Sequence, residues 1–225
     1  MASRVIHLAV AAELAGANDI GDTERFFFGH VLPDMVMGEY EVRLPAKQKT
    51  HFYTLLQSGR KTYDFYRFYE EYKDRLDDML YLGYYVHLIE DNIFRQYLYY
   101  RVGLLKRRGE RELLDEIYED YHLLNPILRE KYGIKLPAVP KGLEGEEIFK
   151  RFDFTVDEWL DDMKGDLTER PEGELKHFTQ ELIGEFIAEC TDVITKELKA
   201  NEQGRHYLTL DDYSIENYYK GELRK

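Results

Sequence analysis

The chain has 225 residues, of which 44% are hydrophobic, so it is long enough and apolar enough to bury a globular core. Its formal net charge of −13 and its pI of about 5.1 oppose binding to phosphate backbones, which argues against a nucleic-acid-binding protein. The single cysteine, Cys190, excludes an internal disulfide and every cysteine-based zinc motif. A metal site in this chain therefore needs His, Asp and Glu ligands.

No membrane span is expected, because no segment approaches the roughly 18 consecutive apolar residues that a spanning helix requires. The N-terminal run VIHLAVAA is short and is interrupted by His7 and Glu13, which is not typical of a signal peptide. We expect a cytoplasmic protein whose first helix belongs to the fold. Nothing in the sequence specifies an oligomeric state.

Helix-period patterns cover most of the chain and strand signals are nearly absent, which predicts an all-α fold. Ser3 can cap the first helix, and Gly16 can end it. A loop rich in Gly, Asn, Asp and Pro follows the first helix. The expected helices lie at about 4–15, 23–29, from 50 onward, 63–72, 76–106, 111–132, 145–152, 156–167 and 172–199.

A Pro- and Gly-rich stretch, KLPAVPKGLEG at 135–145, is the best candidate boundary along the chain. We expect a single all-helical domain over 1–225, with the half that holds the candidate site at about 1–132. The helices after the boundary allow a C-terminal helical subdomain over 145–225, whose role the sequence does not indicate.

The helix expected at 76–106 carries polar residues on its apolar stripe. At 100° per residue, His87 and Asp91 fall on one face together with Leu80, Tyr84, Phe94 and Leu98. An ionised carboxylate on a buried face is unfavourable unless it has a partner, which can be Arg95 on the next turn or a metal cation. A histidine and an aspartate four residues apart can bind one ion from a single helix.

Other candidate ligands lie earlier in the chain. The helix at 4–15 is apolar on every side, so His7 is expected to be buried. Asp34 follows a proline in GHVLPD, where His30 lies near the site or lines it, and His51 in KTHFY is expected to open a helix. Each has an ordinary explanation as a core histidine or a turn residue, but their joint occurrence beside apolar residues favours a metal site. His and carboxylate ligands suit zinc, manganese or iron.

The set of His7, GHVLPD at 29–34, KTHF at 49–52 and GYYVHLIED at 83–91 resembles the zinc-dependent phospholipase C family. That family has an all-helical fold related to the single-strand-specific zinc nucleases. The resemblance covers roughly residues 1–100 and implies a multi-helical bundle around a buried metal site.

The resemblance also implies the ligands. It places Asp34, His51, His87 and Asp91 around one zinc, and His7 at another zinc that Asp91 bridges. Asp34 is in addition a candidate general base.

Three features depart from the family pattern. A signal peptide and an N-terminal Trp whose amine binds metal are not evident, and position 97 is Tyr where the family has a histidine. The family's later HxxxE motif is matched only by His177 and Glu181, which a helical wheel places opposite the apolar face. We therefore expect one or two ions rather than three.

The expected function is that of a metal-dependent hydrolase acting on a small-molecule or lipid-like phosphoester with metal-activated water. Asp34 or Glu90 can accept a proton from that water, and Arg95 can contact phosphate or neutralise Asp91. The alternative is a non-catalytic helical protein with a structural metal site, which a closed coordination sphere would favour. A phosphohydrolase of the His-Asp type fits less well, because the chain contains no His-Asp dipeptide.

Overall fold

The computed structural model describes residues 2–216 and is mainly helical, which confirms that part of the prediction. Within these residues the α-helices are α1 (Arg4–Ala17), α2 (Thr23–Val31), α3 (Tyr40–Thr50), α4 (Phe65–Tyr72), α5 (Met79–Gln96), α6 (Arg111–Tyr132), α7 (Glu147–Arg151), α8 (Val156–Thr168) and α9 (Gln180–Asn201). A small antiparallel sheet, which the sequence did not predict, consists of β1 (Tyr53–Leu55), β2 (Arg60–Tyr63) and β3 (Ile215–Glu216) in that order.

Helix α1 lies in the interior of the molecule. Its predicted N-cap is confirmed, because the Ser3 hydroxyl accepts a hydrogen bond from the Ile6 amide at 3.2 Å. The helix continues past Gly16 to Ala17, with Asn18 as its C-cap, and its residues from Val5 to Ala11 are all buried. Helices α2, α6 and α9 pack around it, which is why a helix that is apolar on every side is stable here.

Helices α2 and α5 touch through their backbones at two glycines. A Cβ atom at Gly29 would lie 2.1 Å from the carbonyl oxygen of Leu80, and one at Gly83 would lie 2.3 Å from that of Phe26. Only glycine permits so close an approach. The contact brings the end of α2 and the 3₁₀ turn Leu32–Asp34 against α5.

The segment around His51 differs from the prediction. Thr50 is the last residue of α3 and His51 caps its C-terminal end, so His51 does not open a helix. Helix α3 is largely exposed and contains Pro45, and therefore lacks the apolar period that would have revealed it. The chain then turns at Phe52, whose φ of 52° ends the helix, into the β1–β2 hairpin with Thr54 opposite Thr62.

Other helix boundaries also differ from the predicted ones. Helix α5 ends at Gln96 in a π-helical turn, and Gly103, with a φ of 87°, separates it from α6 well before residue 106. Helix α6 spans its predicted range with Pro126 inside it. Helix α9 begins at Gln180, later than the predicted 172.

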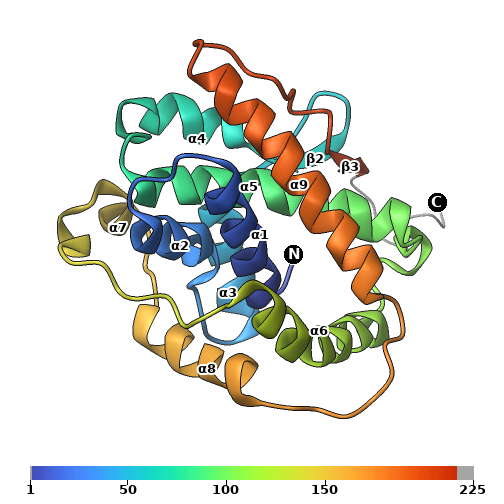
Figure 1. Ribbon diagram of the computed structural model, residues 1–225. Helices are drawn as coiled ribbons and strands as arrows, with labels where there is room; N and C mark the ends of the chain where they lie inside the picture. The colour runs from blue at the N-terminus through green and yellow to red at the C-terminus, as the bar shows by residue number, and fades with distance from the viewer. Residues whose placement is uncertain (1, 217–225) are drawn as a thin grey trace.

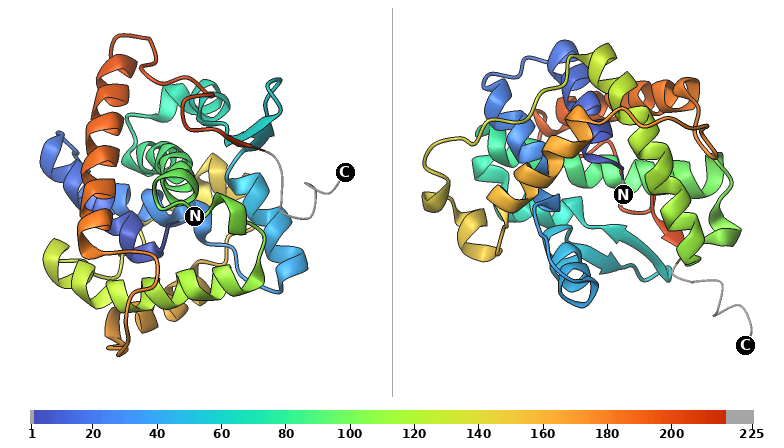
Figure 2. Two further views of the ribbon diagram at one scale, coloured as in Figure 1. Left: turned by 90° about the vertical axis from the view of Figure 1, so that its right-hand side faces the viewer. Right: turned by 90° about the horizontal axis from the view of Figure 1, so that it is seen from below.

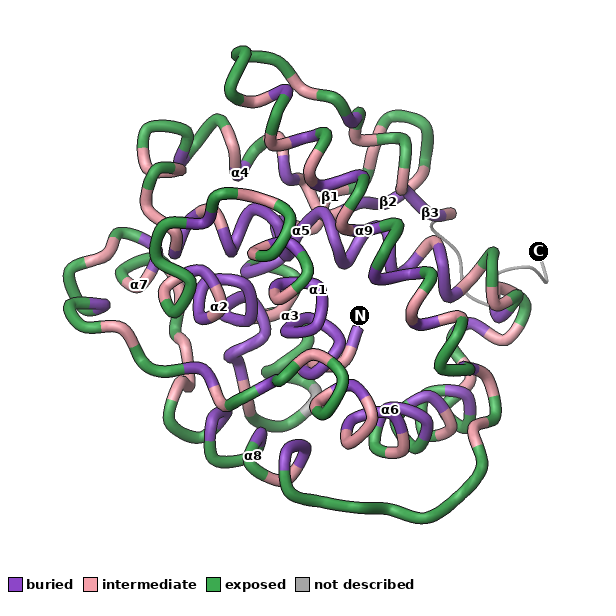
Figure 3. The backbone as a smooth tube through the Cα atoms, viewed as in Figure 1, coloured by how far each residue is buried: buried purple, intermediate pink, exposed green. Residues whose placement is uncertain are grey.

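The helices form layers around α5, which crosses the centre of the molecule (Figure 1). Helix α9 packs across α1 and α5, α6 packs on α1, and α8 packs on α6, while the sheet lies beside α3 and α5 (Figure 2). Helices α1 and α5 are buried along most of their length, whereas α3 and the outer face of α8 are exposed (Figure 3).

One hydrophobic cluster extends from Ala2 to Leu208, so the core includes side chains from both sides of the predicted boundary at 135–145. Residues 217–225 of the predicted C-terminal subdomain lie outside the described residues. No described helix combines the length and the apolar character needed to cross a bilayer.

Candidate metal centre

The fold brings the five predicted ligands into one buried cluster. His87 and Asp91 lie on α5, and the other three come from α1, the 3₁₀ turn after α2 and the end of α3. None of the five is more than 4% exposed: His7, Asp34, His51, His87 and Asp91. Two sets of three have ligand atoms within 4.8 Å of one another, namely His7, His87 and Asp91, and Asp34, His51 and His87.

His51 and His87 face each other through nitrogens that cannot both donate. The Nδ1 atom of His51 lies 2.8 Å from the carbonyl oxygen of Lys47, and that of His87 lies 2.7 Å from the carbonyl oxygen of His30. Since carbonyl oxygens only accept, each Nδ1 carries a proton, and each neutral ring presents a lone pair on Nε2. The two Nε2 atoms are 3.1 Å apart, which requires a proton or a metal cation between the rings.

Several distances between the ligand atoms are close to those around a tetrahedral ion. Bonds of about 2.0–2.1 Å place ligand atoms about 3.3–3.4 Å from one another. Around the 3.1 Å pair, Nε2 of His51 lies 3.3 Å from Oδ1 of Asp34 and 3.4 Å from Oδ2 of Asp91. Nε2 of His87 lies 3.7 Å from Oδ2 of Asp91. Asp34, His51 and His87 therefore form a set that could hold a metal ion, with Asp91 beside it.

His7 adds a third imidazole nitrogen beside this group. Its ring stacks on His87 with centroids 4.3 Å apart, and its Nε2 lies 3.7 Å from both Oδ2 of Asp34 and Oδ1 of Asp91. This buried Nε2 has no hydrogen-bond partner, nor does Oδ2 of Asp91. Buried polar atoms are rarely left without partners, so both atoms are available to a cation.

Glu90 lies behind His7, on the far side of the ring from this nitrogen. Its Oε2 is 2.5 Å from Nε2 of His30 and 2.9 Å from Nδ1 of His7, although the latter pair is an ion-pair contact rather than an aligned hydrogen bond. All three side chains are fully buried. They form another set of possible ligands, or a support that orients the His7 ring.

The charges in the cluster depend on one another. Burial lowers the pKa of His7, but Glu90, Asp91 and Asp34 outweigh that effect and raise it to about 9. Burial and the neighbouring charge of His7 hold the pKa of His87 well below its usual range. Burial raises the pKa of Asp91, yet its histidine neighbours outweigh burial and lower it. The cluster thus holds ionised carboxylates in the interior, which suits cation binding.

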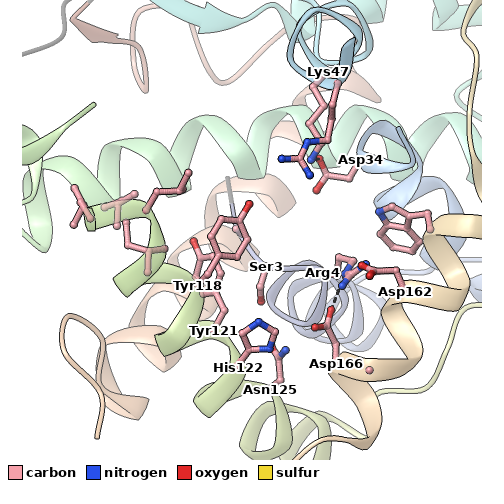
Figure 4. A pocket seen from close by; sticks show the side chains of 18 of the residues that line it. Ser3, Arg4, Asp34, Lys47, Tyr118, Tyr121, His122, Asn125, Asp162 and Asp166 are labelled. Atoms are coloured by element: carbon pink, nitrogen blue, oxygen red, sulfur yellow. Dashed lines mark hydrogen bonds and ion pairs between the residues drawn. The ribbon is translucent and has the colours of Figure 1, made fainter. Parts of the chain in front are cut away.

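Asp34 connects the cluster to a cleft of about 980 Å³. The cleft lies between the N-terminal end of α1 and helices α3, α6 and α8 (Figure 4). Lys47 reaches across its wall, with Nζ 2.8 Å from Oδ1 of Asp34. Burial raises the pKa of Asp34, but Lys47 and His51 overcome this and hold it well below its usual value.

Arg95 lies against neither Asp91 nor the cleft. Its guanidinium stacks 3.8 Å from the centroid of the Tyr63 ring and donates to Oδ1 of Asn92. Within residues 2–216 it forms no ion pair with a carboxylate. Tyr63 in turn contacts His51, with ring centroids 5.0 Å apart. The predicted contact of Arg95 with phosphate stays a prediction.

The later histidine motif is not part of the cluster. His177 precedes α9, and its Nε2 lies 2.8 Å from Glu116 on α6. The helical wheel that placed His177 and Glu181 on one helix is wrong, because the residues from 172 to 179 are not helical.

The position of Lys47 beside Asp34 was not predicted from the sequence, and the role of His30 was left open. Lys47 lies four residues before His51 on α3, a spacing that would have indicated it had the helix been recognised. His30 lies four residues before Asp34, and its link to Glu90 depends on the contact between α2 and α5. No protein-family model, curated protein or solved structure matches this chain.

Proposed function

We propose that this chain is a metal-dependent phosphoester hydrolase related to the zinc-dependent phospholipase C family. The observation that carries the proposal is the convergence of His7, His51 and His87 nitrogens on two buried carboxylates, next to a cleft that one of those carboxylates lines. The quoted motifs of the sequence support the same assignment.

Zinc is the preferred ion, with manganese or iron as alternatives, in one or two positions. Asp34, His51, His87 and Asp91 would hold the first ion, and His7 with Asp91 the second. Such ions polarise a phosphoryl oxygen and lower the pKa of bound water. Asp34 would accept a proton from that water, since it alone of the five residues also lines the cleft. Glu90 as proton acceptor stays a prediction.

The wall of the cleft opposite Lys47 supports a substrate with an apolar part. Helix α6 contributes Leu114 and Tyr118, which are 49% and 48% exposed, beside the more buried Leu113 and Ile117. Apolar surface left open in a cleft commonly contacts a ligand. A lipid-like phosphoester would place its phosphate near Asp34 and its apolar group along α6.

A structural metal site is the second candidate. His7, His87 and Asp91 are fully buried, as expected for ligands that enclose an ion. The two candidates differ in whether a coordination position opens toward the cleft, which hydrolysis requires.

Metal analysis combined with phosphodiesterase and phosphatase assays tests the proposal. We expect one or two divalent ions per chain and hydrolysis that a chelator abolishes and added metal restores. Asp91→Asn and His51→Ala should each lower kcat/KM on the order of 100-fold or more. Asp192→Asn, on the exposed face of α9, is the matched control. Bound metal that raises stability without hydrolysis on broad substrate panels would support the structural site instead.

A further inference from the structure

The cleft meets the cluster at a single carboxylate. Of the clustered side chains within the described residues, only Asp34 lines the cleft, whereas the others are enclosed by α1, α2 and α5: His7, His30, His51, His87, Glu90 and Asp91. Any substrate in the cleft therefore approaches the candidate ions past Asp34 and its neighbours.

Lys47 lies at that junction. Its Nζ is 2.8 Å from Oδ1 of Asp34, its side chain is 20% exposed, and it lines the cleft together with Arg43 one turn earlier on α3. Figure 4 shows Lys47 and Asp34 directed toward each other at the boundary of the cleft. The ammonium is thus within reach of both the cluster and a bound molecule.

The backbone of Lys47 is tied to the cluster as well. Its carbonyl oxygen accepts a hydrogen bond from Nδ1 of His51, one turn later along α3. The residue that orients the His51 ring therefore also carries the ammonium at the cleft.

The charges around Asp34 indicate which group the Lys47 ammonium binds during the reaction. Oδ1 of Asp34 also lies 3.3 Å from Nε2 of His51, so it points to where an ion would be held. A carboxylate that binds a divalent cation has less negative charge left for a neighbouring ammonium. Lys47 then needs another anion, and the cleft is the side from which one can arrive.

We propose that Lys47 binds a non-bridging oxygen of the substrate's phosphoryl group and so selects anionic phosphoesters over neutral esters. This role rests on the proposed hydrolase function, which it deepens by assigning a specificity residue. The hydrogen bond would be charge-assisted on both sides, the strongest kind available to a lysine.

The test compares Lys47→Gln and Lys47→Arg with Lys49→Gln, an exposed lysine on the same helix that does not line the cleft. Each metal-loaded variant is titrated with inorganic phosphate and assayed on a nitrophenyl phosphate ester and on a neutral nitrophenyl ester. Lys47→Gln should raise the phosphate dissociation constant and the phosphoester KM about tenfold, the effect of one lost charge-assisted hydrogen bond. Its kcat should change less, and the neutral ester should be unaffected.

Lys47→Arg should recover most of the phosphate affinity, and Lys49→Gln should match the unmodified chain. Unchanged phosphate binding and KM in Lys47→Gln would overturn the proposal. Loss of metal from Lys47→Gln would also overturn it, because the residue would then support Asp34 rather than bind substrate. If the unmodified chain hydrolyses no phosphoester, the hydrolase function fails, and the phosphate dissociation constants alone decide the role of Lys47.

Discussion

Two histidines share one carboxylate oxygen behind the candidate ions. Oε2 of Glu90 contacts Nδ1 of His7 and Nε2 of His30, and all three side chains are fully buried. A carboxylate beside Nδ1 favours the tautomer that carries its proton on Nδ1, which leaves the lone pair on Nε2, the nitrogen that faces Asp34 and Asp91. Glu90 is thus placed to select the tautomer of His7 that can bind a metal.

We predict that Glu90→Gln weakens metal binding by about 10- to 100-fold, the usual effect of removing a carboxylate behind a ligating histidine. Competition against a chromophoric chelator measures this affinity directly. Glu197→Gln is the control, because Glu197 is an equally buried carboxylate that accepts hydrogen bonds from Tyr85 and the backbone at Leu208, away from the cluster. Equal metal affinity in both variants would show that Glu90 does not act through His7.

The contact between α2 and α5 determines where His30 lies. The backbones approach at Gly29 and Gly83, and a Cβ at Gly83 would lie 2.6 Å from the amide nitrogen of His30. The carbonyl oxygen of His30 accepts a hydrogen bond from Nδ1 of His87, and the ring of His30 contacts Glu90. The hydrogen bond from His87 and the contact with Glu90 therefore both depend on the close approach at the two glycines.

We predict that Gly83→Ala forces α2 away from α5, lowers the free energy of unfolding by about 1–3 kcal/mol as overpacking does, and weakens metal binding. Urea unfolding and metal titration measure the two effects. Gly184→Ala on α9 is the matched control, since its added Cβ would meet only the end of Lys131 at 3.8 Å. That variant should be as stable as the unmodified chain or up to about 1 kcal/mol more stable. A Gly83→Ala variant with unchanged affinity would mean that α2 can move without disturbing His87.

Helices with a strong apolar period could be predicted from the sequence, and exposed elements could not. The burial of α1 and the buried stripe of α5 were predicted because their apolar residues recur without interruption. Helix α3 is polar and contains Pro45, and strands of two to four residues are too short to show alternation. Because α3 was not predicted, His51 was expected at the start of a helix rather than at its end, and Lys47 was not recognised.

The five candidate ligands could be named from the sequence, but the supporting contacts of Glu90, which was named only as a proton acceptor, could not be predicted. His7, His87 and Asp91 stand out because polar residues interrupt apolar runs, whereas Glu90 has no such mark on a helix that is buried on nearly every side. Its partners come from α1 and α2, and only the three-dimensional packing of those helices on α5 brings them together.

On the scale of the whole molecule, burial changes the pKa of many tyrosines. The chain has 19 tyrosines. Burial raises the pKa of Tyr84, Tyr85 and Tyr121 well above the usual value, and that of Tyr213 to about 12. Their rings fill the core, and the hydroxyls of Tyr84 and Tyr85 donate to Thr50 and Glu197. The folded state therefore retains phenol protons that the unfolded chain releases near pH 10.

We predict that stability falls steeply once the pH exceeds about 10. Below that value these phenols are protonated in both states and contribute no pH dependence. Between about pH 10 and the raised folded-state pKa, the unfolded chain binds fewer protons, so the free energy of unfolding decreases by up to about 1.4 kcal/mol per pH unit for each such tyrosine. Urea unfolding at a series of alkaline pH values, followed by circular dichroism and phenolate absorbance, measures this.

The phenolate absorbance of the buried tyrosines should rise together with the loss of helix, because these rings ionise only when the core opens. Tyr84→Phe removes one fully buried phenol and should reduce the slope by about one proton. An equal rise in phenolate absorbance during unfolding of Tyr84→Phe and of the unmodified chain would contradict the prediction, since Tyr84 would then titrate in the folded state. The expected coupling instead makes the aromatic core, rather than the metal cluster, responsible for the alkaline limit of the fold.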